Sequence, residues 1–230
     1  MLAIIPARAG SKGVQNKNKK LFCGRPLIEW TIEAAINAKS VSRVLLTSND
    51  EEILDNRYVN QHCDFVIKRP DNLAADDSPA ISYVEHALNV VPGLNEIKYF
   101  SVLQPTSPLR LADDIDELFK RVSEQNFKGG VTVVDLPHNF LPHKLMKITG
   151  GYVTPSSETQ SGKNLRQEEN LTYVARNGAA VYICEVEHFL QSHSLFSDRM
   201  AYCKMPFSRS VDIDTVEDFD LAQLIMQEMM

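Results

Sequence analysis

The sequence predicts an α/β fold, a mostly parallel sheet with helices on both faces, in a single domain spanning residues 1–230. Short β-branched or apolar runs alternate with helical patterns along the chain, as in βαβ units. The first apolar run leads directly into a loop rich in glycine and lysine, at the position where open α/β sheets bind ligands. No internal repeat and no clear linker divides the chain.

Each element rests on a local pattern. The stretch from Pro26 to Ile36 carries apolar residues at helical spacing, and Ile115 begins an i, i+3, i+4, i+7 stripe. Ser78 and Pro79 are typical of an N-cap and a first helical residue. The Gly-, Ser- and Thr-rich stretch at 149–164 is interpreted as a hairpin or mobile excursion from the sheet. Strands are predicted at Leu2–Ile5, Val44–Thr47, Phe65–Ile67, Phe100–Leu103, Val131–Val134 and Val181–Cys184.

Composition excludes several classes of protein. With 43% hydrophobic and 23% charged residues, the chain is typical of a soluble globular protein. No apolar run approaches the ~20 residues of a membrane span, and "MLAIIPA" is too short for the apolar region of a signal peptide. The four cysteines are scattered without a CxxC spacing, so we expect reduced thiols in a cytoplasmic protein. The net charge of −6 argues against nucleic acid or membrane partners.

The charge is unevenly distributed. No carboxylate precedes Glu29, whereas six cations do, so the remaining 18 cations and 30 anions give that part of the chain a charge of −12. A positive pocket in an acidic body predicts a small anionic ligand.

The glycine-lysine loop "PARAGSKG" carries the chemistry for such a ligand. Gly10 and Gly13 let the backbone approach an anion and present N–H groups to it. Arg8 and Lys12 can neutralise polyphosphate charge. The spacing matches neither a P-loop nor a dinucleotide fingerprint. A surface turn with solvated lysines is the alternative.

A pair of aspartates lies in "RSVDIDTVEDFDLA". If Val211–Asp214 is extended, Asp212 and Asp214 project to the same face. Together they can hold Mg²⁺, with waters and substrate phosphates completing its shell. The alternative is local: Asp214 or Thr215 caps the C-terminal helix, since Thr215 and Asp218 resemble a capping box.

Two further segments carry polar groups at loop positions. "LQPTSPLR" follows a predicted strand and offers Gln104 for hydrogen bonding, with a plain turn as the alternative. In "NLRQEENLTYVARNG", an arginine at 166 or 176 could clamp a carboxylate. His138 and His143 lack carboxylate or thiolate company, which makes them weak candidates for zinc.

Seven motifs occur in one order over nearly the whole chain: "IIPARAGSKGVQNKN", "PLIEWTIEAA", "TSND", "RPDNLAAD", "LQPTSPLR", "RNGAAVYI" and "SVDIDTVEDF". In this combination the sequence resembles the acylneuraminate cytidylyltransferases. The "RAGSKG" of the first loop favours this branch over the related Kdo cytidylyltransferases.

The resemblance implies a Rossmann-like nucleotidyltransferase fold with a small projecting dimerisation and substrate region at about 136–175. It implies a homodimer that converts CTP and a nonulosonic acid to the CMP-sugar and pyrophosphate, with Mg²⁺ as cofactor and Mn²⁺ as a substitute. The C2 hydroxyl of the sugar would attack the α-phosphate.

The resemblance also implies site residues. Those carried over as catalytic are Arg8, Lys12, Lys17, Asp212 and Asp214, with the two aspartates as metal ligands. Those carried over as nucleotide-binding are Arg8, Gly10, Ser11, Lys12, Gly13, Asn18, Arg69, Ser78 and Ala80. Those carried over as sugar-binding are Gln104, Lys144, Arg166, Gln167, Asn177 and Tyr182.

The chain departs from the family pattern at three places. Ala80 stands where many relatives have Ser or Thr, which leaves Ser78 as a substitute. "NGAAVY" is one residue longer than the commoner N-G-A-I-Y, so the register of Tyr182 stays open. His143 is an alternative to Lys144.

Two other functions compete with this interpretation. The same chemistry on legionaminic, pseudaminic or Kdo-type acid, or on a sugar 1-phosphate, would use the same fold. A non-catalytic nucleotide-binding protein on this sheet would bind CTP without forming product.

Overall fold

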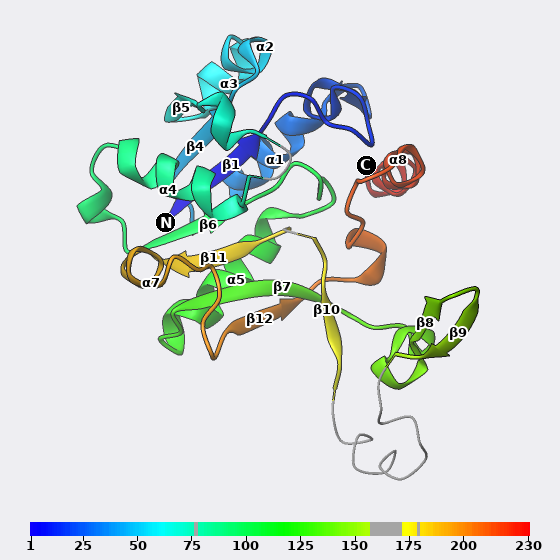
Figure 1. Cartoon of the computed structure of the whole chain (residues 1–230). Helices are drawn as coiled ribbons and strands as arrows, with labels where there is room; N and C mark the ends of the chain where they lie inside the picture. Colours follow the sequence, from blue (N-terminus) through cyan, green and yellow to red (C-terminus); the bar gives the residue numbers. More distant parts are fainter. Residues whose placement is uncertain (76–77, 157–171, 179) are drawn as a thin grey trace.

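A computed structural model gives the structure of the chain and describes residues 1–230 except 76–77, 157–171 and 179. An eight-stranded sheet has the order β10-β7-β11-β6-β1-β4-β5, and β12 pairs with β7 (Figure 1). Its strands are β1 (Leu2–Ala7), β4 (Arg43–Ser48), β5 (Phe65–Lys68), β6 (Tyr99–Val102), β7 (Gly129–Asp135), β10 (Val174–Arg176), β11 (Tyr182–Glu185) and β12 (Ala201–Lys204). The α/β prediction is therefore confirmed, and each of the six predicted strands lies within two residues of an observed one.

Two strands depart from the expected parallel order. Parallel pairing joins β1 to β4 and β6, β4 to β5, and β7 to β12. In contrast, β11 lies antiparallel between β6 and β7, and β10 is antiparallel to β7. The reason is topological: the chain leaves the sheet at the end of β7 and re-enters at that same end along β10.

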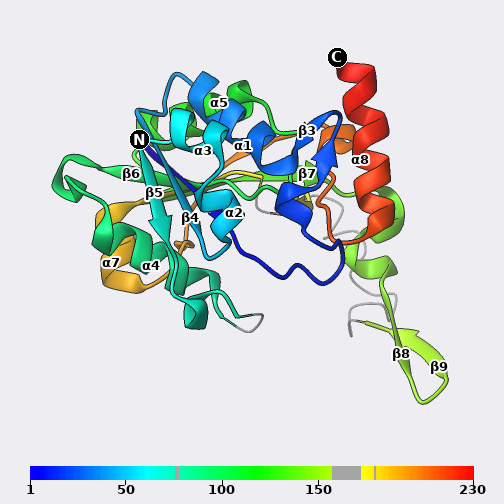
Figure 2. The ribbon, with the colours of Figure 1, turned by 90° about the horizontal axis from the view of Figure 1, so that it is seen from above.

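Helices cover both faces of the sheet. Figure 2 shows α1, α3 and α5 on one face and α4 and α7 on the other. Ile5 packs in the cluster that contains Ile32, and its neighbour Ile4 packs in the cluster that contains Leu88, because successive residues of a strand point to opposite faces. The α-helices are α1 (Leu27–Asn37), α2 (Glu51–Leu54), α3 (Arg57–His62), α4 (Ala80–Val90), α5 (Ala112–Glu124), α7 (Val186–Ser192) and α8 (Val216–Met229).

A third cluster attaches the C-terminal helix α8 beside the sheet. Phe219 of α8 packs edge-on against Phe22 of the small hairpin β2 (Leu21–Phe22) and β3 (Arg25–Pro26). Val14 of the first loop and Ile213, which precedes α8, belong to the same cluster and are fully buried. Hydrophobic packing therefore fixes the first loop next to the segment with the two aspartates.

The prediction that Ser78 caps a helix is wrong. Helix α4 begins at Ala80, and Pro79 occupies the N-cap with an extended ψ of 143°. The Ser78 hydroxyl instead donates to the carbonyl of Asn72 at 2.8 Å. Because Pro79 is the N-cap and not the first helical residue, the helix starts one residue later than predicted.

A hairpin projects from the sheet where β7 ends (Figure 1), formed by β8 (Met146–Thr149) and β9 (Tyr152–Pro155). Within the described residues, no helix combines the length and apolar character needed to cross a membrane. Short 3₁₀ helices lie at η1 (Lys17–Lys19), η2 (Asp71–Leu73), η3 (Leu94–Glu96), η4 (His138–Phe140), η5 (Pro142–Lys144) and η7 (Phe207–Arg209).

Candidate active site

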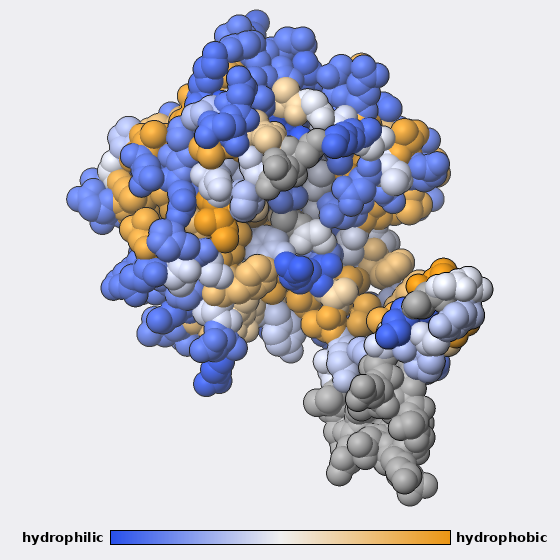
Figure 3. All heavy atoms as spheres, in the orientation of Figure 1, coloured by the Kyte–Doolittle hydropathy of each residue, from blue (hydrophilic) through white to orange (hydrophobic). Residues whose placement is uncertain are grey.

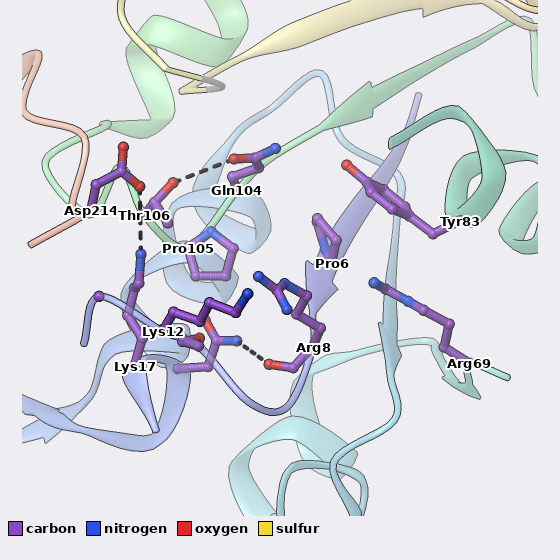
Figure 4. A pocket seen from close by; sticks show the side chains of 13 residues that line it. Pro6, Arg8, Lys12, Lys17, Arg69, Tyr83, Gln104, Pro105, Thr106 and Asp214 are labelled. Atoms are coloured by element: carbon purple, nitrogen blue, oxygen red, sulfur yellow. Dashed lines mark hydrogen bonds and ion pairs between the residues drawn. The ribbon is translucent and has the colours of Figure 1, made fainter. Parts of the chain in front are cut away.

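A cavity of about 370 Å³ lies at the carboxyl ends of β1, β5 and β6 (Figure 4). Four cations and one carboxylate line it, so its potential favours an anion. The side chains of Arg8 and Lys12 extend into it (Figure 4). The lining residues are Pro6, Arg8, Ser11, Lys12, Gly13, Lys17, Asn18, Arg69, Tyr83, Gln104, Pro105, Thr106 and Asp214.

The glycine-lysine loop is folded against the protein. Gly10 has a φ of +73°, a conformation that glycine adopts without strain. The side-chain amide of Asn18 donates to the Arg8 carbonyl at 3.1 Å. Lys17, which follows the loop, is only 8% exposed, whereas Lys12 is exposed and lines the cavity.

The loop and the aspartate segment meet directly. A Cβ atom on Gly13 would lie 1.8 Å from the carbonyl oxygen of Asp214, so only glycine fits there. The Lys17 ammonium donates to the Ile213 carbonyl and lies 3.8 Å from Asp214 Oδ1. Lys17, expected to bind phosphate, therefore also connects the two segments.

The aspartate segment is irregular and does not form a strand. The Ile213 N–H donates to the carbonyl of Thr106 at 2.8 Å and holds the segment to the loop after β6. Asp212 and Asp214 line two different cavities that adjoin each other. Thr215 caps α8 in a capping box with Asp218, which leaves the Asp214 carboxylate 79% exposed.

Asp212 is the more buried of the two. Burial raises the pKa of its carboxyl and the charge of Asp214 adds to the rise, while a hydrogen bond with Thr106 and the charge of Lys17 oppose it. Its Oδ1 is buried without a hydrogen-bond partner among the described residues. Gly178, with a φ of +66°, packs on this carboxyl: a Cβ there would lie 2.5 Å from it. A buried carboxylate oxygen without a donor suits a cation.

A second cavity, of about 520 Å³, adjoins the first and shares Tyr83 and Gln104 with it. Polar side chains such as Asp212 and Arg176 line part of this cavity, and apolar side chains such as Leu195 line the rest. Its lining residues are Ala80, Tyr83, Val102, Gln104, Arg176, Gly178, Tyr182, Leu195, Phe196 and Asp212. Each of the two adjoining cavities thus contains one aspartate, Asp214 in the first and Asp212 in the second.

Arg176 is held in place in the second cavity. Its guanidinium donates to the Tyr182 hydroxyl at 3.1 Å and lies 5.2 Å from the ring centroid of Phe196. Tyr182 and Phe196 in turn pack edge-to-face, with centroids 5.7 Å apart. A positioned arginine beside apolar surface suits an organic acid.

Arg69 lines the first cavity although it is only 3% exposed. It donates to the Thr47 carbonyl at 2.9 Å and lies 4.6 Å from the ring centroid of Tyr83. Burial, together with a smaller effect of the charge of Arg8, lowers the pKa of Arg69 to about 10, while Tyr83 opposes this change. The guanidinium remains charged at neutral pH and presents a rigid planar donor.

The structure brings most of the predicted site residues together, but not all of them. Asn177 is 4% exposed, forms hydrogen bonds with Thr132 and Ser210, and lines neither cavity. Lys144 lies on the projecting region, where its ammonium contacts His138 at 2.7 Å. Gly10 and Ser78 line neither cavity. Arg166, Gln167 and the side chain of His143 lie outside the described residues, among which no cluster of three metal-ligating side chains occurs.

Sequence reasoning missed Tyr83, which lines both cavities. It lies in α4 among residues at helical spacing, and it is 8% exposed, so it was indistinguishable from a core aromatic. Only its position one turn after Ala80, at the amino end of α4, could have indicated a role.

Comparison with known proteins agrees with this geometry. The sequence model of a family described as Cytidylyltransferase matches residues 2–229. An N-acylneuraminate cytidylyltransferase of Escherichia coli is 30% identical over 99% of this chain and 52% of its own length, so the chain spans about half of that relative. A CMP-N,N'-diacetyllegionaminic acid synthase of Legionella pneumophila is 30% identical, with 99% of this chain and 96% of that protein covered. A pseudaminic acid cytidylyltransferase of Campylobacter jejuni is 26% identical, with 97% and 95% covered.

Solved structures share the fold. The CMP:2-keto-3-deoxy-manno-octonic acid synthetase complexed with CTP superposes with a TM-score of 0.73 at 15% identity, covering 100% of this chain and 99% of the other. A 4-diphosphocytidyl-2C-methyl-D-erythritol synthase gives 0.68 at 12% identity, with 98% and 97% covered.

Proposed function

The chain belongs to the cytidylyltransferase family, and from that premise we propose that it transfers CMP from CTP to a nonulosonic acid and releases pyrophosphate. The observation that carries the proposal is the pair of adjoining cavities, which share Gln104 and Tyr83 and have an aspartate in each. One cavity has the charge for a nucleoside triphosphate, and the other combines an arginine with apolar surface for an acidic sugar.

CTP would occupy the first cavity. Arg8 and Lys12 would neutralise the triphosphate, and backbone N–H groups of the loop from Ser11 to Gly13 would bind its oxygens. Asn18 would contact the ribose, and Arg69 would lie along the cytidine. The cations would act most on the departing pyrophosphate, where charge develops during the reaction.

The acid would occupy the second cavity, with Arg176 as the partner of its carboxylate and Gln104 and Tyr182 as further polar contacts. Its C2 hydroxyl oxygen would form the new bond to the α-phosphorus while the bond from that phosphorus to the bridging oxygen of pyrophosphate breaks. The proton of the hydroxyl would pass to Asp212 or Asp214. Lys144, Arg166 and Gln167 would approach the sugar from the projecting region.

Asp212 and Asp214 would hold Mg²⁺, for which Mn²⁺ can substitute. The donor set fits this cation, because Asp212 has a buried oxygen without a partner among the described residues and Asp214 faces the triphosphate cavity. When bound, the metal would neutralise phosphate charge and orient the reacting groups. The protein's own part is to fix the backbone between the two carboxylates through the buried Ile213.

The lining of the second cavity favours an acylated acid over a Kdo-type acid. Ala80, Val102, Leu195 and Phe196 offer apolar contact to acyl and methyl groups. An acid with hydroxyl groups only would leave this surface without apolar partners. N-acetylneuraminic, legionaminic and pseudaminic acids all carry acyl groups and remain the candidates.

A homodimer is part of the proposal. The projecting hairpin exposes Ile148 at 81%, Tyr152 at 61% and Val153 at 60%, more apolar surface than a small hairpin keeps in water. Figure 3 shows apolar residues on the described part of this projection. A second copy would cover them.

The test is Mg²⁺-dependent release of pyrophosphate from CTP with N-acetylneuraminic, legionaminic, pseudaminic or Kdo acid, and with ATP and UTP as nucleotide controls. Turnover with CTP and one acylated acid would support the proposal and name the substrate. Binding of CTP without turnover of any acid would favour the non-catalytic alternative. Turnover with Kdo alone would overturn the proposed acid class.

A further inference from the structure

The motif "TSND" has no role in the proposed chemistry, yet it occupies a central position. Its residues Thr47 and Ser48 end β4, which lies between β1 and β5 in the sheet. The loop after β1 carries the cations, and the turn after β5 carries Arg69. A side chain just beyond β4 can therefore contact both walls of the nucleotide cavity.

Asn49 makes both contacts. Its Oδ1 accepts a hydrogen bond from the Ala9 N–H at 2.8 Å, next to Arg8 in the cation loop. Its Nδ2 donates to Asp71 Oδ1 at 3.1 Å, two residues beyond Arg69. One amide group thus joins the two segments between which the nucleotide would lie.

Other contacts already anchor each segment separately. The Ser48 hydroxyl donates to the Ala7 carbonyl, and the Arg69 N–H donates to the Ser48 carbonyl at 2.7 Å. These contacts bind each loop to the sheet, whereas the Asn49 amide binds the two loops to each other. We therefore expect that loss of the Asn49 side chain leaves the fold intact but no longer fixes the distance between the two loops.

We propose that Asn49 is a positioning residue for the nucleotide, and that its amide sets the distance between the cation loop and the Arg69 turn. The inference rests on the proposed binding of CTP between them. An amide is required because one end must accept while the other donates. A carboxylate at this position would keep the bond from Ala9 but would face Asp71, a like charge.

The test exchanges the amide of residue 49 and the carboxylate of residue 71. In Asn49→Asp the two carboxylates repel, and we expect KM for CTP to rise roughly tenfold or more, as a lost hydrogen bond to a charged group implies. KM for the acid and kcat at saturating CTP should stay within about twofold of their unmodified values, since the acceptor cavity is not touched. In Asp71→Asn the bond from Asn49 persists, so KM for CTP should change little.

The double variant is the decisive measurement. Asn49→Asp with Asp71→Asn recreates the bond in the opposite direction, with the new amide donating to the new carboxylate. KM for CTP should return to within about threefold of its original value. If KM for CTP is not restored although both single variants fold, the hydrogen bond between residues 49 and 71 does not set the distance between the two loops.

Hydrogen exchange tests the inference without nucleotide. The Ala9 amide should be protected in the unmodified protein and in Asn49→Asp, and should exchange faster in Asn49→Leu, which is similar in size but has no acceptor. Asn60→Leu is the matched control, because Asn60 of α3 also donates through its amide, to the Leu54 carbonyl at the end of α2 and to the Asn56 carbonyl at the N-cap of α3.

The outcomes separate the two proposals. If the unmodified protein does not bind CTP while Ala9 shows the expected protection, the proposed function fails and the connection between the loops stands. If CTP binds and Asn49→Leu changes neither KM for CTP nor the exchange of Ala9, the positioning role is wrong. A third outcome is that Asn49→Leu lowers kcat and the melting temperature and changes KM for CTP and KM for the acid to the same extent. In that case Asn49 has a structural role only.

Discussion

Replacement of Gly13 by alanine tests whether the contact between the cation loop and the aspartate segment matters for catalysis. The added Cβ would lie 1.8 Å from the Asp214 carbonyl oxygen, whereas ordinary contact begins at roughly 3.4 Å. The two backbones must therefore separate by about 1.6 Å, the difference between these distances. Neither atom belongs to a flexible side chain, so the displacement cannot be absorbed by a rotamer change.

A misplacement of about 1 Å costs on the order of 10²-fold in rate when reacting groups must be aligned. We therefore expect Gly13→Ala to lower kcat/KM at least ~10²-fold while the protein still folds, with a loss of ~1–3 kcal/mol typical of overpacking. The assay is steady-state pyrophosphate release, with the melting temperature of each variant measured alongside.

Gly24→Ala provides the control. Gly24 has a φ of +86° and nothing within 4 Å of an added Cβ, so alanine costs ~1–2 kcal/mol of strain without displacing the site. Its kcat/KM should remain unchanged despite the lower stability. If Gly13→Ala keeps kcat/KM within threefold of its original value, or if Gly24→Ala loses as much, the argument from loop separation is wrong.

Three further substitutions test other parts of the structure. Lys17→Met removes the donor to Ile213 and should lower kcat/KM by roughly tenfold or more in the same assay, with little loss of melting temperature. Arg176→Lys should raise KM for the acid about tenfold and leave KM for CTP unchanged, because a lysine cannot replace a bidentate fork. For Asp116, burial alone would raise the pKa of its carboxyl, but hydrogen bonds, chiefly from Ser40, outweigh burial and lower it. Its contribution to stability is thus present above the ordinary value of 3.8 and lost as pH falls through the lowered pKa, so Asp116→Asn should lower the melting temperature at pH 7, with a difference that shrinks in acid.

The regular part of the fold could be predicted because its strands contain short runs of apolar or β-branched residues. β1 and β4 are buried on both faces, and β1 and the Val44–Leu46 part of β4 appear as continuous apolar runs. β10 has three residues, of which Val174 and Arg176 are exposed, and its pattern does not differ from that of a loop. The direction of β11 was also not available from the sequence, because direction depends on where the chain re-enters the sheet.

The candidate site also has features that the sequence predicted and features that it did not. Its charged groups were visible because a run of cations without nearby carboxylates, and two aspartates at a spacing of two residues, stand out in the sequence. The distribution of Asp212 and Asp214 over two cavities was not visible, because it depends on a hydrogen bond between Ile213 and Thr106, more than a hundred residues away along the chain.

Ile213 shows how the fold tolerates a site that is locally unfavourable. A buried carboxylate such as that of Asp212 loses hydration, and a second carboxylate two residues away adds repulsion. The residue between them is fully buried with Val14 and Phe219, and burial of an isoleucine contributes ~2–3 kcal/mol. Ile213 is the direct chain neighbour of both aspartates. Its burial therefore offsets the electrostatic cost of holding the two carboxylates close together in this segment. An Ile213→Ala variant should therefore affect the orientation of both aspartates at once, whereas a cavity of the same size elsewhere in the core should lower stability alone.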